Sequence, residues 1–530
     1  MDPLTSVSTR ATSQLLRADE RQIPNAAGGH GFALDDDTRV LRFLTLGTDG
    51  GTYYATAREL TAQNAPVVLR AARERTAWLV EKVVAISTAG RAPRQNAAIF
   101  ALAAAAALGD DAGRRGALDA LPAVCRTGTH LFLFARYVEQ FRGWGRGLRR
   151  AVARWYTEPD VDDVAFQAVK YRQREGWSHR DLLRLAHPSV TDPARRALFR
   201  WIVEDEAGED APEIVHGYLA ARAATTASAW VRLVIDHRLS WEMLPDAALG
   251  EPDVWRALLA NGLPPTALLR QLPRLTRLGV LTGDIRRSVA AQLADPARLR
   301  RGRVHPVSVL VALRTYASGS GAGGTWEPIR EIVDALDAAF YAAFTTVVPS
   351  GKRTLLAVDV SGSMKVGSVS GLPLSPREAS AALALVTMST ERDATCVGFT
   401  SADGGWAPAL TELAISPRQR LDDAITAVSR LPFGSTDCAL PMEWARETGR
   451  AFDTFVVLTD NETWAGAIHP HQALVRYRER SGIDARLVVV GMTATDVSIA
   501  DPADGGMLDV AGFDAAAPGL VADFSRGDLG

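Results

Sequence analysis

Cysteine is scarce in this chain of 530 residues, which contains Cys125, Cys396 and Cys438. An odd number of widely separated cysteines argues against a disulfide framework and against a structural zinc site. We therefore expect reduced thiols, which predicts a cytoplasmic protein.

Targeting and membrane-spanning segments are lacking as well. The start, MDPLTSVSTR, has no basic residues followed by an apolar core, so we expect no signal peptide. The apolar run AAIFALAAAAAL, from Ala97 to Leu108, is too short and too rich in alanine to cross a bilayer. It predicts a buried helix instead, and we expect no membrane partner.

Motifs of nucleotide chemistry are missing too. The chain has no Gly-x-x-x-x-Gly-Lys-Ser/Thr phosphate loop. A phosphoryl-accepting aspartate usually has a second acid two residues on, but Ser361 stands there after Asp359. GWGRG (Gly143–Gly147) has the glycine spacing of a dinucleotide loop, yet it lies in helical, arginine-rich sequence, so we predict no dinucleotide site. We expect a binding protein and not an enzyme.

Lysine is nearly absent, with four residues, and arginine supplies the positive charge. The formal net charge of −2 conceals two parts of opposite sign, because residues from Lys352 onward hold 15 basic and 23 acidic side chains. Residues 126–154 hold seven arginines and one acid, and residues 270–303 hold nine arginines and two acids. Such clusters favour a polyanion partner. The alternative is that they only keep a large helical domain soluble.

The first 345 residues read as a succession of helices. From about Asp37 to Leu313, apolar residues recur three and four positions apart between breaks of Gly, Pro, Asp or Ser. Short helices of this kind cannot bury their faces alone and must stack, as in an α-solenoid. We predict an all-α helical-repeat domain over residues 1–345, although no clean repeat period is visible.

The pattern changes near Pro349. Four apolar runs of strand length, TLLAVDV, DATCVGFT, TFVVLTD and ARLVVVGM, alternate with helical segments such as SPREASAALALVTMSTE. There, Ser375 is placed to cap a helix and Pro376 to occupy its first position. Strands alternating with helices predict a parallel sheet covered on both faces. Residues 346–530 are therefore expected to form an α/β, doubly wound, Rossmann-like domain.

Oxygen-bearing side chains gather at the predicted strand ends. Asp359 ends the first strand in LLAVDVSGSM, with Ser361 and Ser363 just after it, and Asp460 ends a later strand in VVLTDNE. Ligands of doubly wound sheets bind beyond the carboxyl ends of the strands, where the loop GSTDCALP can also bring Thr436. Carboxylate and hydroxyl oxygens suit Mg²⁺, or another divalent cation such as Mn²⁺, better than zinc or copper. We predict a site for one such ion.

A second candidate site lies in KYRQREGWSHRDLLRLAHP, residues 170–188. Basic side chains contact phosphates and aromatic rings stack on unpaired bases, so the segment predicts RNA binding. Its leucines are expected in the core, together with Tyr171 and Trp177. The candidates are Lys170, Arg172, Arg174, Arg180, Arg184 and His187.

The order Asp-x-Ser-x-Ser, Thr, Asp resembles the metal-ion-dependent adhesion site of von Willebrand factor A domains. The resemblance implies that Ser361, Ser363 and Thr436 ligate the ion directly, and that Asp359 and Asp460 act directly or through water. It also implies an open coordination position that accepts a carboxylate from an acidic protein ligand.

Phrases from both halves resemble the Ro autoantigen family, in which a TROVE module precedes an A domain. The resemblance implies that HEAT-like repeats of residues 1–345 close into a ring, whose ends are joined by the von Willebrand factor A domain of residues 346–530. The matching phrases run in order along nearly the whole chain: RFLTLGTDGGTYY, VCRTGTHLF, KYRQREGWSHRDLLRLAHP, LSWEMLPDAAL, LDAAFYAAFTTVVPSGKRTLLAVDVSGSM, GSTDCALPM, LTDNETWAG and ADPADGGMLDVAGFD.

The same resemblance implies a function and partners. A small Y RNA is expected on an outer basic surface, where Lys170, Arg174 and His187 match family positions. Misfolded noncoding RNAs are expected to thread single-stranded 3′ ends into the ring. The phrase CRTGTH matches near its inner face, with candidates Arg126, Thr129 and His130.

Bacterial relatives are linked through the Y RNA to polynucleotide phosphorylase, a 3′→5′ exoribonuclease. We therefore expect a monomeric RNA-binding protein of noncoding-RNA quality control and stress survival. Two other functions remain open: an A-domain scaffold for adhesion or complex assembly, and an accessory subunit of an ATPase or chelatase. The arginine clusters favour RNA binding, and the chain offers neither a secretion signal nor an ATPase motif.

Overall fold

The computed structural model describes residues 10–46, 66–91, 95–302, 304, 306–321, 323–343, 348–365, 374–401, 409–416, 419–431, 434–492, 497–511 and 517–528. The predicted domain boundary between residues 345 and 346 lies outside these ranges. Parts of the quoted phrases, at residues 47–54 and 512–514, lie outside them as well. All of the predicted site residues lie within them.

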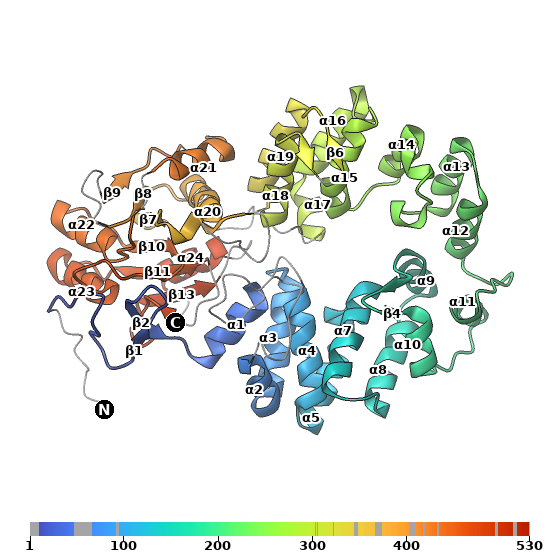
Figure 1. Ribbon diagram of the computed structural model, residues 1–530, viewed down its shortest axis with the longest axis horizontal. Helices are drawn as coiled ribbons and strands as arrows, with labels where there is room; N and C mark the ends of the chain where they lie inside the picture. Colours follow the sequence, from blue (N-terminus) through green and yellow to red (C-terminus); the bar gives the residue numbers. More distant parts are fainter. Residues whose placement is uncertain are drawn as a thin grey trace.

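Helices follow one another around a wide arc, which confirms the helical-repeat prediction (Figure 1). Two short hairpins, β3 (Gln173–Arg174) with β4 (Trp177–Ser178) and β5 (Ser320–Gly321) with β6 (Gly324–Thr325), interrupt it, as do the 3-10 turns η1 (Trp241–Met243) and η2 (Ala248–Gly250). The helices of the arc are α1 (Asp36–Leu46), α2 (Pro66–Glu74), α3 (Thr76–Ala89), α4 (Asn96–Leu108), α5 (Asp111–Asp119), α6 (Leu121–Val124), α7 (Gly128–Phe141), α8 (Arg146–Thr157), α9 (Val161–Lys170), α10 (His179–Ala186), α11 (Pro193–Glu204), α12 (Glu213–Ala223), α13 (Ala227–His237), α14 (Pro252–Ala260), α15 (Pro265–Arg277), α16 (Gly283–Ala294), α17 (Pro296–Arg301), α18 (Pro306–Ala317) and α19 (Arg330–Ala342).

The alanine-rich run forms α4, which confirms the predicted buried helix. From Ala97 to Ala107 its residues are at most 7% exposed, and the helix packs against α3, α5 and α7. A helix that is apolar on every side must be covered on every side. Within the described ranges, no helix combines the length and the apolar character needed to cross a membrane.

Among the described residues, the second part of the chain contains a six-stranded sheet with the order β13-β11-β10-β7-β8-β9. Its first five strands are parallel, but β9 (Leu410–Glu412) runs antiparallel to β8. The sheet is therefore mixed, where the sequence predicts a parallel one, because the short connection before β9 leaves no room for a crossover. The other strands are β7 (Thr354–Asp359), β8 (Ala394–Phe399), β10 (Thr454–Thr459), β11 (Arg486–Gly491) and β13 (Met507–Ala511).

Alternate residues of each central strand face opposite layers of helices. On β7, Leu356 and Val358 belong to one core with α20 and α21, whereas Leu355 and Ala357 belong to another with α22 and α23. This is the doubly wound arrangement that the sequence predicts, and Ser375 caps α20 as expected. The helices are α20 (Pro376–Thr390), α21 (Leu421–Ser429), α22 (Leu440–Thr448), α23 (Pro470–Ser481) and α24 (Ala517–Arg526).

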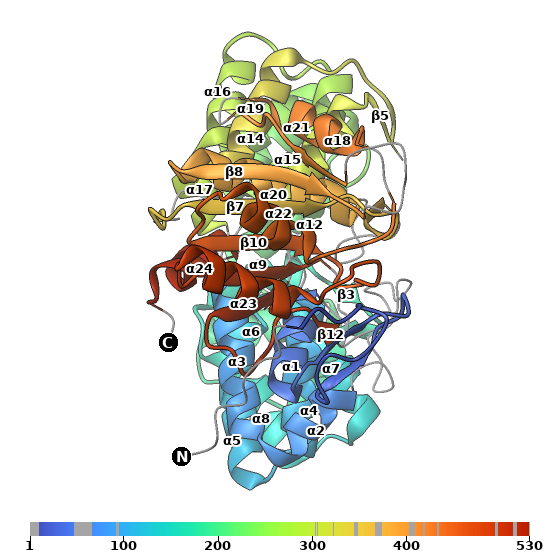
Figure 2. The same ribbon diagram turned by 90° about the vertical axis from the view of Figure 1, so that its left-hand side faces the viewer.

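The described N-terminal residues lie against the sheet domain. We call residues 10–33 the N-terminal strap. Its strands β1 (Gln22–Pro24) and β2 (His30–Ala33) pair with each other, and β2 pairs with β12 (Val497–Ser498) of the sheet domain (Figure 2). The sequence prediction, by contrast, assigns this segment to the helical domain.

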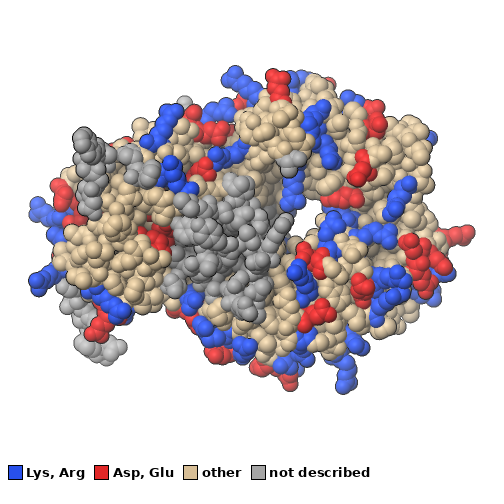
Figure 3. Space-filling view, in the orientation of Figure 1, with Lys and Arg blue, Asp and Glu red and all other residues tan. Residues whose placement is uncertain are grey.

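The sheet domain joins the two ends of the arc, so the protein forms the expected ring (Figures 1 and 2). At one end, Arg42 of α1 pairs with Asp509 of β13 at 2.8 Å. At the other end, Arg420, just before α21, pairs with Asp334 of α19 at 2.7 Å. Figure 3 shows an opening through the molecule, with Lys and Arg side chains at its upper and lower edges.

Candidate metal and nucleic-acid sites

Asp359 ends β7 at the carboxyl edge of the sheet, where its side chain is fully buried. Its Oδ1 accepts a hydrogen bond from the backbone N of Ser361 at 2.8 Å, and its Oδ2 accepts one from Thr459 Oγ1 at 2.7 Å. Asp460, which follows Thr459 at the end of the neighbouring strand β10, is also fully buried. The two predicted carboxylates thus lie at one edge of the sheet.

The predicted serine ligands lie on the loop that follows β7. Ser361 Oγ and Ser363 Oγ are 3.1 Å apart. Arg377 of α20 holds the backbone of this loop in place. Its guanidinium donates to the carbonyls of Val360 and Ser361, the latter at 2.7 Å. Arg377 is 1% exposed. Sequence reasoning missed it, and an arginine in the first turn of a helix, where an acid is favoured, is the signal that could have found it.

Thr436 is 3% exposed on the loop before α22. Its carbonyl accepts hydrogen bonds from the backbone N of Trp464 at 3.1 Å and of Ala465 at 3.0 Å. Because these residues follow Asp460 closely, the Gly-Ser-Thr loop is held against the segment that continues from β10. The topology therefore brings the loop of Thr436 to the strand end of Asp460, as the sequence predicts.

The N-terminal strap reaches the same two loops through Gln14, which is fully buried. Gln14 Nε2 donates to Asp437 Oδ1 at 2.8 Å, and Gln14 Oε1 accepts from Thr463 Oγ1 at 2.6 Å. One amide thus ties the residue after Thr436 to the segment after Asp460. A side chain at Gly466 would lie 2.2 Å from the amide, so glycine is required at that position.

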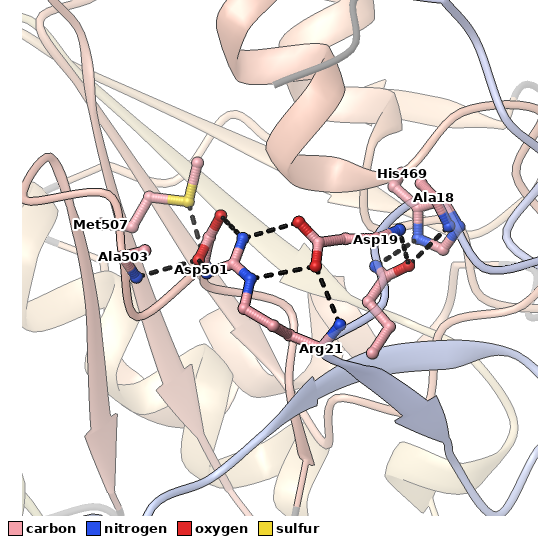
Figure 4. Close-up of polar contacts among 8 residues, drawn as sticks. Ala18, Asp19, Arg21, His469, Asp501, Ala503 and Met507 are labelled. Atoms are coloured by element: carbon pink, nitrogen blue, oxygen red, sulfur yellow. Dashed lines mark hydrogen bonds and ion pairs between the residues drawn. The ribbon is translucent and has the colours of Figure 1, made fainter. Parts of the chain in front are cut away.

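Figure 4 shows a second attachment of the strap, at Arg21. Its guanidinium donates to Asp501 Oδ1 at 2.7 Å and Oδ2 at 2.8 Å, and its Nε donates to Asp19 Oδ1 at 2.9 Å. The hydrogen bonds from Arg21 hold the pKa of Asp19 below its usual value. Nearby, Gln22 Nε2 lies 3.1 Å from His469 Nδ1. Sequence reasoning missed the strap entirely.

The donor set fits a hard divalent cation. Burial, and next the neighbouring Asp460 carboxylate, raise the pKa of Asp359 to about 7, so two negative charges oppose each other there. A cation relieves that repulsion, and the hydroxyls of Ser361, Ser363 and Thr436 supply neutral oxygens. In the part of the chain that the structure describes, no cluster of three or more His, Cys, Asp or Glu side chains could hold a metal. An ion here would therefore depend on the hydroxyl ligands.

The predicted RNA-binding segment runs from the end of α9 through the β3–β4 hairpin into α10. Arg174 is exposed and pairs in register with Trp177 across the hairpin. Ser178 caps α10 by accepting a hydrogen bond from the backbone N of Asp181 at 3.3 Å. The hairpin and the helix therefore form one continuous unit.

Three predicted residues form a stripe along α10. Arg180 and Arg184 are one turn apart, and His187 follows at the helix end in a left-handed conformation with φ of 45°. All three are exposed, whereas Leu182 and Leu183 are buried as predicted. Within the described ranges neither arginine forms an ion pair, so both guanidinium groups are available to phosphates.

Arg172 and Arg180 line a cavity of about 330 Å³ together with Trp201 and Asp205. The Arg172 guanidinium lies 5.0 Å from the centre of the Trp201 ring and 3.5 Å from Asp205 Oδ1. The Trp201 ring holds the guanidinium of Arg172 in place, and the N–H groups of that guanidinium can still donate to an acceptor such as a phosphate oxygen. This cavity extends the stripe of α10 towards α11.

Lys170 is already engaged within the protein. Its side chain is 10% exposed, and its Nζ lies 3.5 Å from Glu242 Oε1 and 5.3 Å from the centre of the Phe166 ring. These contacts join α9 to the turn η1. Among the six candidates of this segment, Lys170 is half-buried and the other five are exposed.

The candidates Arg126, Thr129 and His130 lie at the start of α7 and are half-buried. Arg126 Nη1 donates to Ser87 Oγ and to the carbonyl of Ala123, both at 2.9 Å. Burial, and next the charge of Arg126, lower the pKa of His130 to about 4, so its ring is neutral at pH 7. These three residues are tied to local structure more than those of α10.

His179, in the same segment, is a core residue. It is 2% exposed, and its Nδ1 lies 2.6 Å from the Tyr156 hydroxyl. Burial lowers its pKa to about 3, so it remains neutral. Its contact with Tyr156 fastens α10 to α8.

Two domain families match the chain. Residues 23–207 and 218–318 match the TROVE domain, and residues 353–525 match the Ro60 vWA domain. A curated relative from Deinococcus radiodurans, RNA-binding protein RO60, is 43% identical and covers 99% of both chains. Its counterpart of the same name from Caenorhabditis elegans is 36% identical over 98% of this chain and 92% of its own. The chain belongs to the Ro60 family.

A solved Ro60-family structure has the same fold. The crystal structure of the Ro protein (RSR) of Deinococcus radiodurans matches with a TM-score of 0.73 and 43% identity, over 93% of this chain and all of that one. The predicted resemblance to the Ro family, and the order of helical ring and von Willebrand factor A domain, are thereby confirmed. The TROVE match begins at residue 23, within the N-terminal strap. Residues 23–33 of the strap are therefore TROVE sequence, although the strap packs on the other domain.

Proposed function

We propose that this Ro60-family protein binds RNA through the β3–β4 hairpin and α10. The observation that carries the proposal is the exposure of Arg174, Arg180 and Arg184, which have no carboxylate partner within the described ranges. Arginine donors in a fixed fork suit phosphate oxygens. The names of both curated relatives, RNA-binding protein RO60, support the same assignment.

The proposed ligands are a small Y RNA on this surface and noncoding RNAs whose single-stranded 3′ ends enter the ring. The opening edged with Lys and Arg side chains supports the second ligand (Figure 3). The proposed role is quality control of noncoding RNA under stress, together with a 3′→5′ exoribonuclease such as polynucleotide phosphorylase. In this role the protein acts as a monomer that binds and presents RNA and cuts nothing itself.

The sheet domain is proposed to hold one Mg²⁺ or Mn²⁺ with Ser361, Ser363 and Thr436, and with Asp359 and Asp460 as direct or water-mediated partners. Such an ion, when bound, supplies a Lewis-acidic position for the carboxylate of an acidic protein partner. The buried pair of carboxylates supports this proposal, because a cation stabilises its charged form. Docking of a protein is thus a second candidate function, on the other domain.

RNA binding is tested by fluorescence anisotropy with a Y-like stem-loop and with a single-stranded 3′ tail. Between 50 and 200 mM salt, affinity for the stem-loop should fall roughly a thousandfold if six or more phosphates are contacted. The triple variant Arg174→Gln, Arg180→Gln, Arg184→Gln should weaken stem-loop binding strongly and tail binding less.

A charge-matched control separates local contacts from net charge. The triple variant Arg392→Gln, Arg430→Gln, Arg480→Gln removes three exposed arginines that form no ion pair within the described ranges of the sheet domain. It should bind both RNAs like the wild type. A flat salt response, or equal losses in the two triple variants, would refute the proposed interface.

A further inference from the structure

A cavity of about 260 Å³ lies between α5, α7 and α8. Its walls combine an apolar floor with a rim of cations. Ala106, Leu118, Val138 and Leu148 supply the floor, and Asp111 is the one acid in the lining. The rim consists of Arg114, Arg115, Arg142, Arg146 and Arg150.

The charges of this rim are nearly uncompensated. Arg114 lies 3.5 Å from Asp111, and its Nε is buried without an acceptor. Within the described ranges, the other four arginines form no ion pair and no side-chain hydrogen bond, and all four are exposed. Five cations around one small cavity repel one another, so an anion placed among them is stabilised.

The start of α8 adds backbone donors to the same cavity. Its N-cap is Gly145, which has no side chain to accept from the first-turn N–H groups, and the first turn contains no acid. Gly145, Gly147 and Leu148 line the cavity, so the positive end of the helix faces it. Free N–H groups at a helix start bind phosphate. The phrase GWGRG, which we do not expect to bind a dinucleotide, thus places the start of α8 at the cavity.

The helix α7 and the loop that follows it border this cavity and also contact the proposed RNA surface. Trp144, in the loop between α7 and α8, packs against Trp177 of the hairpin with ring centres 5.5 Å apart. Arg136 of α7 forms an ion pair with Glu175 at the hairpin turn. A strand lying on the hairpin therefore has a short path to the cavity.

We propose that this cavity binds a phosphate group of an RNA strand, an inference that rests on the proposed RNA binding. The phosphate lies at the start of α8 between Arg142, Arg146 and Arg150, and the attached sugar or base covers the apolar floor. Guanidinium groups suit a phosphodiester because they donate two parallel hydrogen bonds. Free phosphates share this chemistry, so the test includes inorganic pyrophosphate as a probe.

The sharpest variant is Gly145→Asp, with Gly145→Asn as its matched control. Gly145 has extended backbone geometry with φ of −82°, and a Cβ there would meet only Arg142, at 3.6 Å. Both side chains are good N-caps, so neither variant should lower the melting temperature. The aspartate, however, places a negative charge where the phosphate is proposed to lie.

For the full-length protein and the stem-loop RNA, Gly145→Asp should lower the salt slope of log K by about one, as expected for one lost phosphate contact. It should also abolish the pyrophosphate-induced rise in melting temperature, while Gly145→Asn keeps both responses. The triple variant Arg142→Gln, Arg146→Gln, Arg150→Gln should behave like Gly145→Asp, and the sheet-domain triple variant like the wild type.

The outcomes separate this inference from the proposed function. Normal RNA affinity and an unchanged salt slope in Gly145→Asp and in the arginine variant would overturn the cavity assignment alone. A wild type that binds no RNA would overturn the proposed function, and with it RNA as the source of the phosphate. A pyrophosphate response in that protein, lost in Gly145→Asp, would assign the cavity to a free phosphate instead.

Discussion

Arg42 joins the first helix of the ring to the edge strand of the sheet, and its removal is the most direct test of how the ring is closed. Its Nη2 donates to both carboxylate oxygens of Asp509 at 2.8 Å, and Ser498 Oγ donates to the same carboxylate. The Arg42 side chain is 1% exposed and that of Asp509 is 10% exposed. Water therefore has little access to the Asp509 carboxylate and cannot readily replace the hydrogen bonds and positive charge of the Arg42 guanidinium.

The expected magnitude follows from this burial. Arg42→Met leaves the Asp509 carboxylate buried without its cation, and breaking a buried pair in this way costs about 3–5 kcal/mol. Replacing both partners, by Arg42→Met with Asp509→Leu, leaves no buried charge and should cost much less. The control is Arg70→Met. Arg70 of α2 pairs at 2.9 Å with Asp36, which lies on α1 as Arg42 does, and both side chains are nearly half exposed. That exposed pair should contribute about 0–1 kcal/mol.

Hydrogen exchange read by mass spectrometry is the suitable assay, because a two-domain chain need not unfold in one step. In Arg42→Met, peptides of α1 and β13 should exchange faster by a factor of a hundred or more, roughly what 3 kcal/mol implies, while peptides of α20 keep their protection. Equal exchange in Arg42→Met and Arg70→Met, or a double variant that opens as readily as the single one, would refute the reasoning.

Four further predictions concern the metal site and the strap. Ser361→Ala with Ser363→Ala should abolish a one-to-one heat of Mn²⁺ binding in calorimetry without unfolding the domain; equal heats with the wild type would contradict the metal site. Because burial and Asp460 raise the pKa of Asp359 to about 7, a cation must displace its proton, so Mn²⁺ affinity should fall as pH drops from 7 to 6, and a flat profile would contradict this. By the same linkage, the metal-free protein should lose stability as pH rises from about 4 to 7, since the unfolded chain releases that proton first. Gln14→Ala removes partners of Asp437 and Thr463 and should destabilise the sheet domain by about 1–3 kcal/mol in urea unfolding, whereas Leu15→Ala, at an exposed position, should be neutral.

Local periodicity explains why much of the fold is predictable from the sequence. The runs that form β7, β8, β10 and β11 are continuous and apolar because both faces of the sheet are covered, and α4 is apolar on every side for the same reason. The strands β2 and β12 are different. They are four and two residues long, and their pairing joins Phe32 to Ser498. No pattern within either segment specifies a partner so far along the chain.

In the candidate sites, too, residues that follow from a local sequence pattern can be predicted, and residues that depend on the packing of distant segments cannot. Asp359 and Asp460 can be placed at one sheet edge because the carboxyl ends of parallel strands share that edge. The positions of Gln14 and Arg377 cannot be predicted in this way, because their contacts depend on how segments far apart in the sequence pack together. The same holds for Lys170, because nothing near it in the sequence indicates that Glu242 lies 3.5 Å from its Nζ. The arginine-rich stretch around α8 is visible in the sequence. The sequence does not show that these arginines surround a cavity together with arginines of α5.

The two junctions that close the ring are built differently. Where α1 meets the sheet domain, Arg42 and Gln14 are buried and β2 adds a paired strand. Where α18 and α19 meet α20 and α21, the ion pairs Arg314–Glu378 and Arg420–Asp334 use arginines that are more than 40% exposed. Salt screens exposed pairs far more than buried ones, and water readily replaces them. We infer that a ring that must part to admit a folded RNA would part on the side of α18 and α19, while the N-terminal strap holds the other junction closed.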